Sequence, residues 1–125
     1  MKIENLIEKS KNCIVFQKTD KGYTIKTEAT FLNGKEIDLR LEERSGKVFL
    51  TDNKSTLKYM NDLYELSSTD VKMCISNVLK IYGFSISGGT LLAEIPNENT
   101  FMDKFFDFIM CIGQLSNMFA FFDKP

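Results

Sequence analysis

Three acidic residues are the side chains best suited to chemistry in this sequence. Asp38 and Glu42 lie in an alternating segment that predicts a strand, Asp52 follows the next such segment, and Lys47 lies between them. Carboxylates that converge from neighbouring strands, with a lysine nearby, can hold the metal ions of a nuclease. The sequence therefore allows a divergent metal-dependent nuclease-like enzyme.

The same three acids also fit a purely structural interpretation, which we favour. Asp38 and Glu42 alternate with apolar residues, so they are expected on the solvated face of an antiparallel sheet. Asp52 directly precedes a predicted helix, where its carboxylate can accept backbone N–H groups of the first turn. On this interpretation none of the three is catalytic and none binds a metal.

Histidine is absent from the 125 residues, which excludes Ser–His and Cys–His nucleophile pairs and imidazole ligands for zinc. Cys13, Cys74 and Cys111 each lie in an apolar run and form no Cys-x-x-Cys pair. We therefore expect reduced, buried thiols in a reducing compartment. Gly88–Gly89 lacks the other residues of a phosphate-binding loop and predicts a hairpin turn. The sequence predicts no enzyme activity and no cofactor.

Aromatic residues are concentrated near the end of the chain. Seven of the eleven phenylalanines lie between residues 101 and 122, which is more than one apolar helix stripe can hold. Helical spacing predicts that four of them face inward: Phe101, Phe105, Phe108 and Phe119. The residues that project elsewhere form a possible interaction surface: Met102, Phe106, Met110, Phe121 and Phe122. Either this helix is packed on more than one side, or these residues form an apolar patch for dimerisation or for docking on another protein.

The overall charge is close to neutral, with 16 basic and 17 acidic residues and a net charge of −1. This balance argues against duplex nucleic acid as a partner, because phosphate binding needs a surplus of basic residues. The most apolar stretch, residues 108–122, has about 15 uncharged residues, whereas a membrane-spanning helix needs about 20. The N-terminus lacks the apolar core of a secretory signal. We expect one cytoplasmic domain, residues 1–125.

Strands and helices are predicted in separate runs along the chain. Strand signals cover residues 13–18, 23–31, 37–42, 48–50, 84–87 and 90–95. Helical spacing covers residues 1–12, 57–64, 71–82 and 101–119. Asn33–Gly34 predicts a two-residue type I′ turn, residues 44–47 a second turn, and Asn97 or Asn99 the cap of the last helix. This order predicts an α+β fold in which an antiparallel β-meander and hairpins form a single layer of sheet packed against three to four helices.

Residues 50–57, Leu-Thr-Asp-Asn-Lys-Ser-Thr-Leu, match the pattern Leu-Thr-Asp-Asp-Gly-x-Thr-Leu at five positions. In this respect the chain resembles a bacterial and phage family, domain of unknown function 1828. Thr30-Phe31-Leu32 is similar to a remnant of that family's Thr-Pro-Phe-x-Asp hairpin, and Ile81-Tyr82-Gly83-Phe84 and the last helix are similar in kind. The resemblance covers about residues 23–122. The family's proline is missing and Asn33–Gly34 replaces its acidic turn, which implies that part of any acidic set has been lost.

The resemblance implies a bacterial or phage origin and supplies no activity. Combined with the absence of catalytic motifs, it predicts a non-enzymatic protein-interaction domain that binds another protein. An anti-defence inhibitor of a host defence nuclease, similar to an anti-CRISPR protein, is the concrete form of this hypothesis. The alternatives are the nuclease-like enzyme and a homodimer that uses the last helix.

Overall fold

A single open sheet of six antiparallel strands forms the centre of the computed structural model, which describes residues 2–118. The strands are β1 (Val15–Thr19), β2 (Gly22–Lys26), β3 (Leu39–Arg44), β4 (Lys47–Thr51), β5 (Ser85–Ser87) and β6 (Thr90–Ile95). Their order across the sheet is β1-β2-β3-β4-β6-β5. The helices are α1 (Ile3–Ser10), α2 (Ser55–Asn61), α3 (Thr69–Tyr82) and α4 (Phe101–Ser116), with the short 3-10 helix η1 (Glu98–Thr100) before α4. The predicted α+β class is confirmed.

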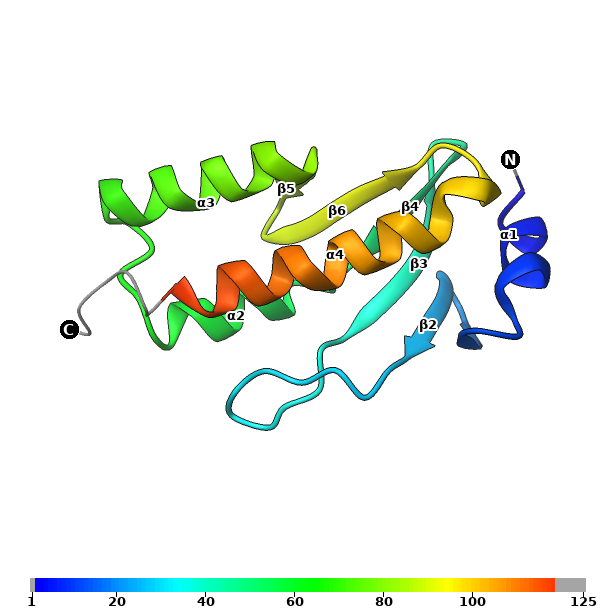
Figure 1. Ribbon diagram of the computed structural model, residues 1–125, viewed down its shortest axis with the longest axis horizontal. Coiled ribbons are helices and arrows are strands. Elements are labelled where there is room, and N and C mark those ends of the chain that lie inside the picture. Colours follow the sequence, from blue (N-terminus) through cyan, green and yellow to red (C-terminus); the bar gives the residue numbers. More distant parts are fainter. Residues whose placement is uncertain (1, 119–125) are drawn as a thin grey trace.

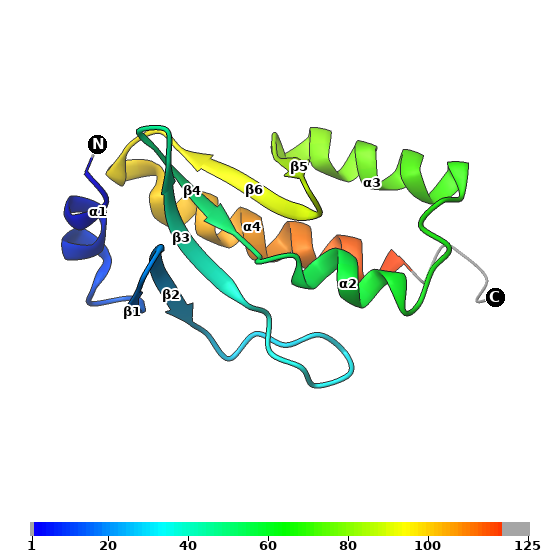
Figure 2. The ribbon, with the colours of Figure 1, turned by 180° about the vertical axis from the view of Figure 1, so that it is seen from behind.

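One face of the sheet is covered by α4, which lies along it in the front view, while the view from behind shows β3 and β4 in front of this helix (Figures 1 and 2). Leu39 and Leu41 of β3 point toward the helix side and are fully buried, whereas Arg40 between them is only partly buried. This alternation follows from the period of two in a strand. The predicted division of the meander into an apolar and a solvated face is thus confirmed.

The inward face of α4 completes the core. Phe101, Phe108, Ile112 and Leu115 have no exposed surface, and Phe105 is 7% exposed. Their spacing of three or four residues places them on one side of the helix, against the sheet. Each such side chain contributes roughly 1.5–3 kcal/mol when it is fully buried. Of the inward residues predicted on this helix, Phe119 lies outside the described residues.

Two hairpin turns have the geometry that their sequences predict. Ser45 and Gly46 connect β3 to β4 with φ angles of 52° and 78°, and Gly88 and Gly89 connect β5 to β6 with φ angles of 58° and 82°. Positive φ at both central positions is the signature of a type I′ turn, whose twist matches that of the flanking strands.

The predictions for the segment from residue 23 to residue 36 were partly wrong. The strand ends at Lys26 instead of residue 31. Directly after this end, the Thr27 hydroxyl accepts the backbone N–H of Ala29 at 3.1 Å. Such a local side-chain bond competes with the ladder of a sheet. The Asn33–Gly34 turn is also not type I′, because only Gly34 has a positive φ. The N–H of Gly34 donates to Phe31 and the N–H of Phe31 donates to Lys35, as in a type I turn followed by a glycine bulge.

Among the helices, α3 has the fewest buried residues for its length. It runs beside α4 in the opposite direction and away from the strands of the sheet (Figure 1). Of its predicted apolar stripe only Val71 is buried; the remaining members, which are only partly buried, are Cys74, Ile75, Val78, Leu79 and Tyr82. The reason is that α3 has α4 on one side and no sheet beneath it. No helix within residues 2–118 is long and apolar enough to cross a membrane.

Candidate functional site

The carboxylate of Asp52 accepts hydrogen bonds from backbone N–H groups. Asp52 directly follows β4, has no exposed surface, and accepts three backbone N–H groups: those of Lys54 and Thr56 at 3.1 Å each and that of Leu91 at 2.9 Å. The first two bonds cap the start of α2, as the sequence predicts. The third bond ties the same carboxylate to β6. Its position is therefore explained without a metal.

The other two predicted acids are paired with arginines on the solvated face. Asp38 accepts from Nε and Nη2 of Arg40 at 3.1 and 3.2 Å and from Asn53 at 3.0 Å. Glu42 accepts from Arg44 at 3.0 and 3.2 Å. The hydrogen bonds that Arg40 donates to the Asp38 carboxylate raise the pKa of Arg40 above its ordinary value. Within residues 2–118, no three histidine, cysteine, aspartate or glutamate side chains are grouped so that they could hold a metal ion.

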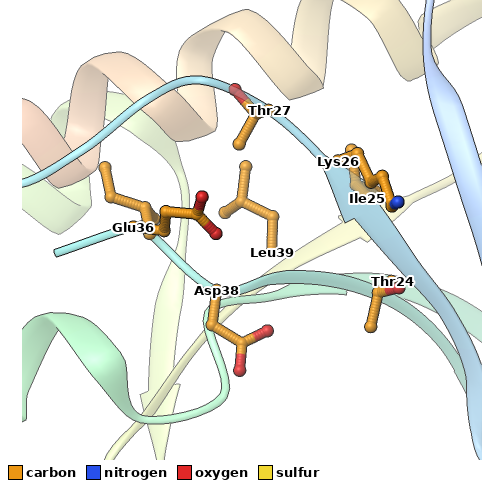
Figure 3. Close-up of a pocket in the computed structure, with 8 residues that line it drawn as sticks. Thr24, Ile25, Lys26, Thr27, Glu36, Asp38 and Leu39 are labelled. Atoms are coloured by element: carbon orange, nitrogen blue, oxygen red, sulfur yellow. The ribbon is translucent and has the colours of Figure 1, made fainter.

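A pocket of about 510 Å³ opens where β2 and β3 diverge (Figure 3). The last paired residues are Ile25 and Leu39, and beyond them Lys26, Glu36 and Asp38 line the opening. Figure 3 shows the carboxylates of Glu36 and Asp38 pointing in different directions. The Asp38 carboxylate is already held by Arg40 and Asn53. This pocket therefore does not present two carboxylates that face each other across its opening.

The three thiols are in three different environments. Cys111 is fully buried, and desolvation, followed by the negative charge of Asp52, raises its pKa to about 12. Its thiol therefore stays protonated and inert near neutral pH. Cys74 is partly buried, and Cys13 is exposed because it lies in the turn between α1 and β1. The prediction that all three are buried was wrong for Cys13 and only partly correct for Cys74.

The predicted interaction residues do not share one environment. Phe106 and Met110 are each 58% exposed, and both lie on the side of α4 that faces away from the core. Met102 is partly buried and packs against the core. Phe121 and Phe122 lie outside the described residues. Of the predicted interaction residues that the structure describes, Phe106 and Met110 are therefore the ones with exposed apolar side chains on α4.

An apolar groove runs between α3 and α4, next to these two residues. It has a volume of about 820 Å³ and is lined by Cys74, Asn77, Val78 and Ile81 of α3 and by Ile109, Met110, Gly113, Gln114, Asn117 and Met118 of α4 and its end. Among residues 2–118, no charged side chain lines it. Ile81 is 74% exposed and Met73 of the same helix is 59% exposed. We call the groove together with Met73, Ile81, Phe106 and Met110 the α3–α4 face.

Gly113 lines the groove on the α4 side and adds no side chain to its wall. Apart from its own helix backbone and chain neighbours, no described atom lies within 4 Å of the position that a Cβ would occupy at this residue. Glycine in a helix interior costs about 0.8–1 kcal/mol relative to alanine. Nothing within the described chain requires that cost here, because neither a close contact nor a positive φ is present.

The α3 half of this face could not be identified from the sequence. Cys74 and Val78 belong to an apolar stripe that predicts an ordinary buried helix side. Two features of the sequence bear on this face: Ile81 lies beside that stripe on α3, and Gly113 lies in the interior of the predicted last helix. Neither signal shows that the two helices lie side by side. That arrangement comes from the fold.

Comparisons with known protein families, with curated proteins and with solved structures found no match. The resemblance to domain of unknown function 1828 therefore stays a prediction.

Proposed function

We propose that this chain is a non-enzymatic protein-interaction domain that binds a protein partner through the α3–α4 face. The observation that carries the proposal is the uncharged groove of about 820 Å³ flanked by Ile81, Phe106 and Met110, each more than half exposed. Contiguous exposed apolar surface of this kind marks interaction sites on small proteins. Methionine and phenylalanine also adapt well to a partner surface.

Burial of this face on a partner supplies the driving force for binding. Apolar area removed from water contributes roughly 25 cal/mol per Å² before the entropic cost of association is subtracted. The amide side chains of Asn77, Gln114 and Asn117 also line the groove and need hydrogen-bond partners once they are buried. The partner surface that fits best is therefore largely apolar, free of buried charge and able to form hydrogen bonds with these amides.

The specific class of partner in this proposal is a host defence protein. The support for it is the predicted bacterial or phage origin together with the small size and near-neutral charge of the chain. Inhibition would then consist of covering a surface on the partner, since no step of covalent chemistry is assigned to this chain.

The experiment is affinity capture from bacterial lysate with matched variants. Met110→Glu and Phe106→Glu place a charge on the α3–α4 face, whereas Leu32→Glu changes a residue that is 69% exposed at a distant hairpin. We expect wild type and Leu32→Glu to retain the same protein, and the two face variants to lose it by at least about tenfold. Capture that is equal for all four proteins would contradict the proposal.

A further inference from the structure

We infer that Asn33 is a site of spontaneous deamidation, at which the folded protein converts a side-chain amide into a carboxylate. The site lies in the loop between β2 and β3, so the inference is independent of the α3–α4 face. Asn33–Gly34 is the only asparagine–glycine pair among the 125 residues. Because glycine has no Cβ, the backbone nitrogen of Gly34 is less hindered than that of any other residue type.

The reaction needs water as its only co-reactant. The backbone nitrogen of Gly34 loses its proton to solvent base and attacks Cγ of Asn33, so that a new N–Cγ bond closes a succinimide ring. The Cγ–Nδ2 bond then breaks, and Nδ2 takes up a proton and leaves as ammonia. One water molecule opens the ring. Cleavage of the N–Cγ bond gives aspartate, whereas cleavage between this nitrogen and the backbone carbonyl carbon of residue 33 gives isoaspartate.

The tip of this loop, residues 32–36, is exposed and extends beyond the ends of β2 and β3 (Figures 1 and 2). Leu32 at its start is 69% exposed. Apart from its chain neighbours, no described atom lies within 4 Å of the position that a Cβ would occupy at Gly34. Solvent therefore reaches both the attacking nitrogen and the amide that it attacks.

Two hydrogen bonds act on the reacting atoms in opposite ways. The N–H of Gly34 donates to the carbonyl oxygen of Phe31 at 2.9 Å, which holds the proton that must leave. The Oδ1 atom of Asn33 accepts the N–H of Lys35 at 3.0 Å. Negative charge develops on this Oδ1 when the nitrogen attacks Cγ, and a backbone N–H already directed at it stabilises that charge. The turn therefore has to release only the first of the two bonds in order to react.

Release of that bond does not require the protein to unfold. Phe31 is buried and its ring stacks on Tyr59 of α2 with 4.4 Å between the ring centroids, and Ile37 is buried on the other side of the tip. These residues fix both ends of the segment, while every residue of the tip itself is exposed. Exposed segments with few buried contacts open at lower free energy than the core. We therefore expect the reaction to proceed from a locally opened loop.

The products change the charge and the backbone at this position. Asn33 lines a small pocket of about 180 Å³ together with Lys35 and Lys58, so the new carboxylate shares this pocket with two lysine side chains. Either product changes the formal net charge from −1 to −2, because one carboxylate is added. Aspartate keeps an acceptor for the N–H of Lys35. Isoaspartate adds one atom to the main chain and breaks the register in which the N–H of Phe31 donates to the carbonyl oxygen of Lys35.

The first test is incubation of the folded full chain in mildly alkaline buffer, followed by peptide mass spectrometry, which detects the replacement of –NH₂ by –OH at each asparagine separately. Asn12 is the internal control, because it is exposed in the turn between α1 and β1 but precedes Cys13 instead of glycine. We expect Asn33 to convert at least about tenfold faster than Asn12. Asn33→Gln should remove the conversion at this position, because glutamine would have to close a larger ring. Equal rates at Asn33 and Asn12 would overturn the inference.

The second test separates reaction of the folded protein from reaction of the unfolded chain. Phe101 is fully buried and packs on Phe16 and Phe105, none of which belongs to the loop. Phe101→Leu should lower the midpoint of thermal unfolding and leave the conversion rate of Asn33 unchanged, because opening of the loop does not disturb this part of the core. A conversion rate that rises in step with the loss of stability would show that only the unfolded chain reacts, which contradicts the inference. Neither result bears on capture of a partner protein, which depends on the α3–α4 face.

Discussion

At the scale of single residues, Asp52 joins three parts of the fold. Its carboxylate is fully buried and binds the start of α2 through Lys54 and Thr56 and the start of β6 through Leu91. Hydrogen bonds to a charged group contribute about 1.5–3 kcal/mol each, and an unpaired buried N–H is costly. This residue is therefore a principal determinant of stability, although its type first suggested chemistry.

Replacement of Asp52 by alanine should be strongly destabilising. It leaves the N–H groups of Thr56 and Leu91 without acceptors in a buried environment. We expect the free energy of unfolding in urea to fall by about 3–5 kcal/mol. Asp62→Ala changes an exposed aspartate at the end of α2 and serves as the control, with an expected change within about 0.5 kcal/mol. Equal effects of the two substitutions would show that the three bonds contribute nothing.

The sequence predicts the hydrogen bonds of Asp52 to the start of α2 but not its hydrogen bond to β6. Its bond to the first turn of α2 is local, and the order strand–aspartate–helix indicates such a cap. The bond to Leu91 spans 39 positions and depends on β4 and β6 being neighbours in the sheet. Local sequence patterns carry no information on that neighbourhood. For the same reason the spacing within one helix predicts the exposure of Phe106 on α4, whereas the exposure of Ile81 depends on the packing of α3.

At the scale of elements, two glycines differ in the space that is available for a Cβ atom. Gly22 begins β2 with a φ of 155°, and a Cβ there would lie 2.2 Å from the carbonyl oxygen of Leu41. That close approach is between two paired strands, so neither backbone can move freely. Gly113, in contrast, lies in helix α4 with open space around it.

Alanine should therefore have opposite effects at these two positions. We expect Gly22→Ala to lower the free energy of unfolding by about 2–4 kcal/mol, because the β2–β3 pair must shift to relieve the collision. We expect Gly113→Ala to raise it by about 0.5–1 kcal/mol through helix propensity. Chemical denaturation followed by circular dichroism measures both. A neutral Gly22→Ala would contradict the close approach.

The elements themselves were largely predictable, because regular periodicity sets β3, β4, α3 and α4 within a few residues of their observed ends. The prediction was wrong where a local side-chain bond competes with the sheet, at Thr27, and where the turn type depends on one residue, at Asn33. The Oδ1 of Asn33 accepts the N–H of Lys35 and stabilises the longer loop. Alternative turn types differ only slightly in free energy, so the dipeptide Asn33–Gly34 alone does not decide which turn forms.

At the scale of the whole molecule, stability is distributed unevenly. The sheet and α4 share an almost fully buried core, whereas α3 buries only Val71 completely and is attached mainly through α4. Regions with little buried apolar area open at lower free energy than the core. We therefore expect α3 to open locally at lower free energy than the sheet and α4.

Amide hydrogen exchange should reveal this difference. At low protein concentration we expect amides in the middle of α3 to exchange faster than those of β3 and β4, with peptides from α4 as the slow helical control. Exchange in α3 as slow as in β3 under dilute conditions would contradict the uneven distribution.

The fold class follows from the order of elements, and the candidate face follows only from their packing. Separate runs of strands and helices are enough to predict an α+β protein. The groove, however, requires α3 to lie beside α4 instead of on the sheet, and no single helix stripe encodes that placement. Met110 was identifiable from its own helix, while Cys74 and Val78 looked like ordinary core residues.

The adjacency of β4 and β6 gives the chain a modular construction. Between residues 52 and 91 the chain leaves the sheet through α2 and α3, returns to the edge of the sheet as β5 and then enters β6 beside β4, and Asp52 binds both ends of this excursion. An insertion whose ends lie together can be lengthened, shortened or exchanged at small entropic cost to the scaffold. Since this excursion carries α3, substitutions and changes of length can accumulate in α3 while the sheet stays constant.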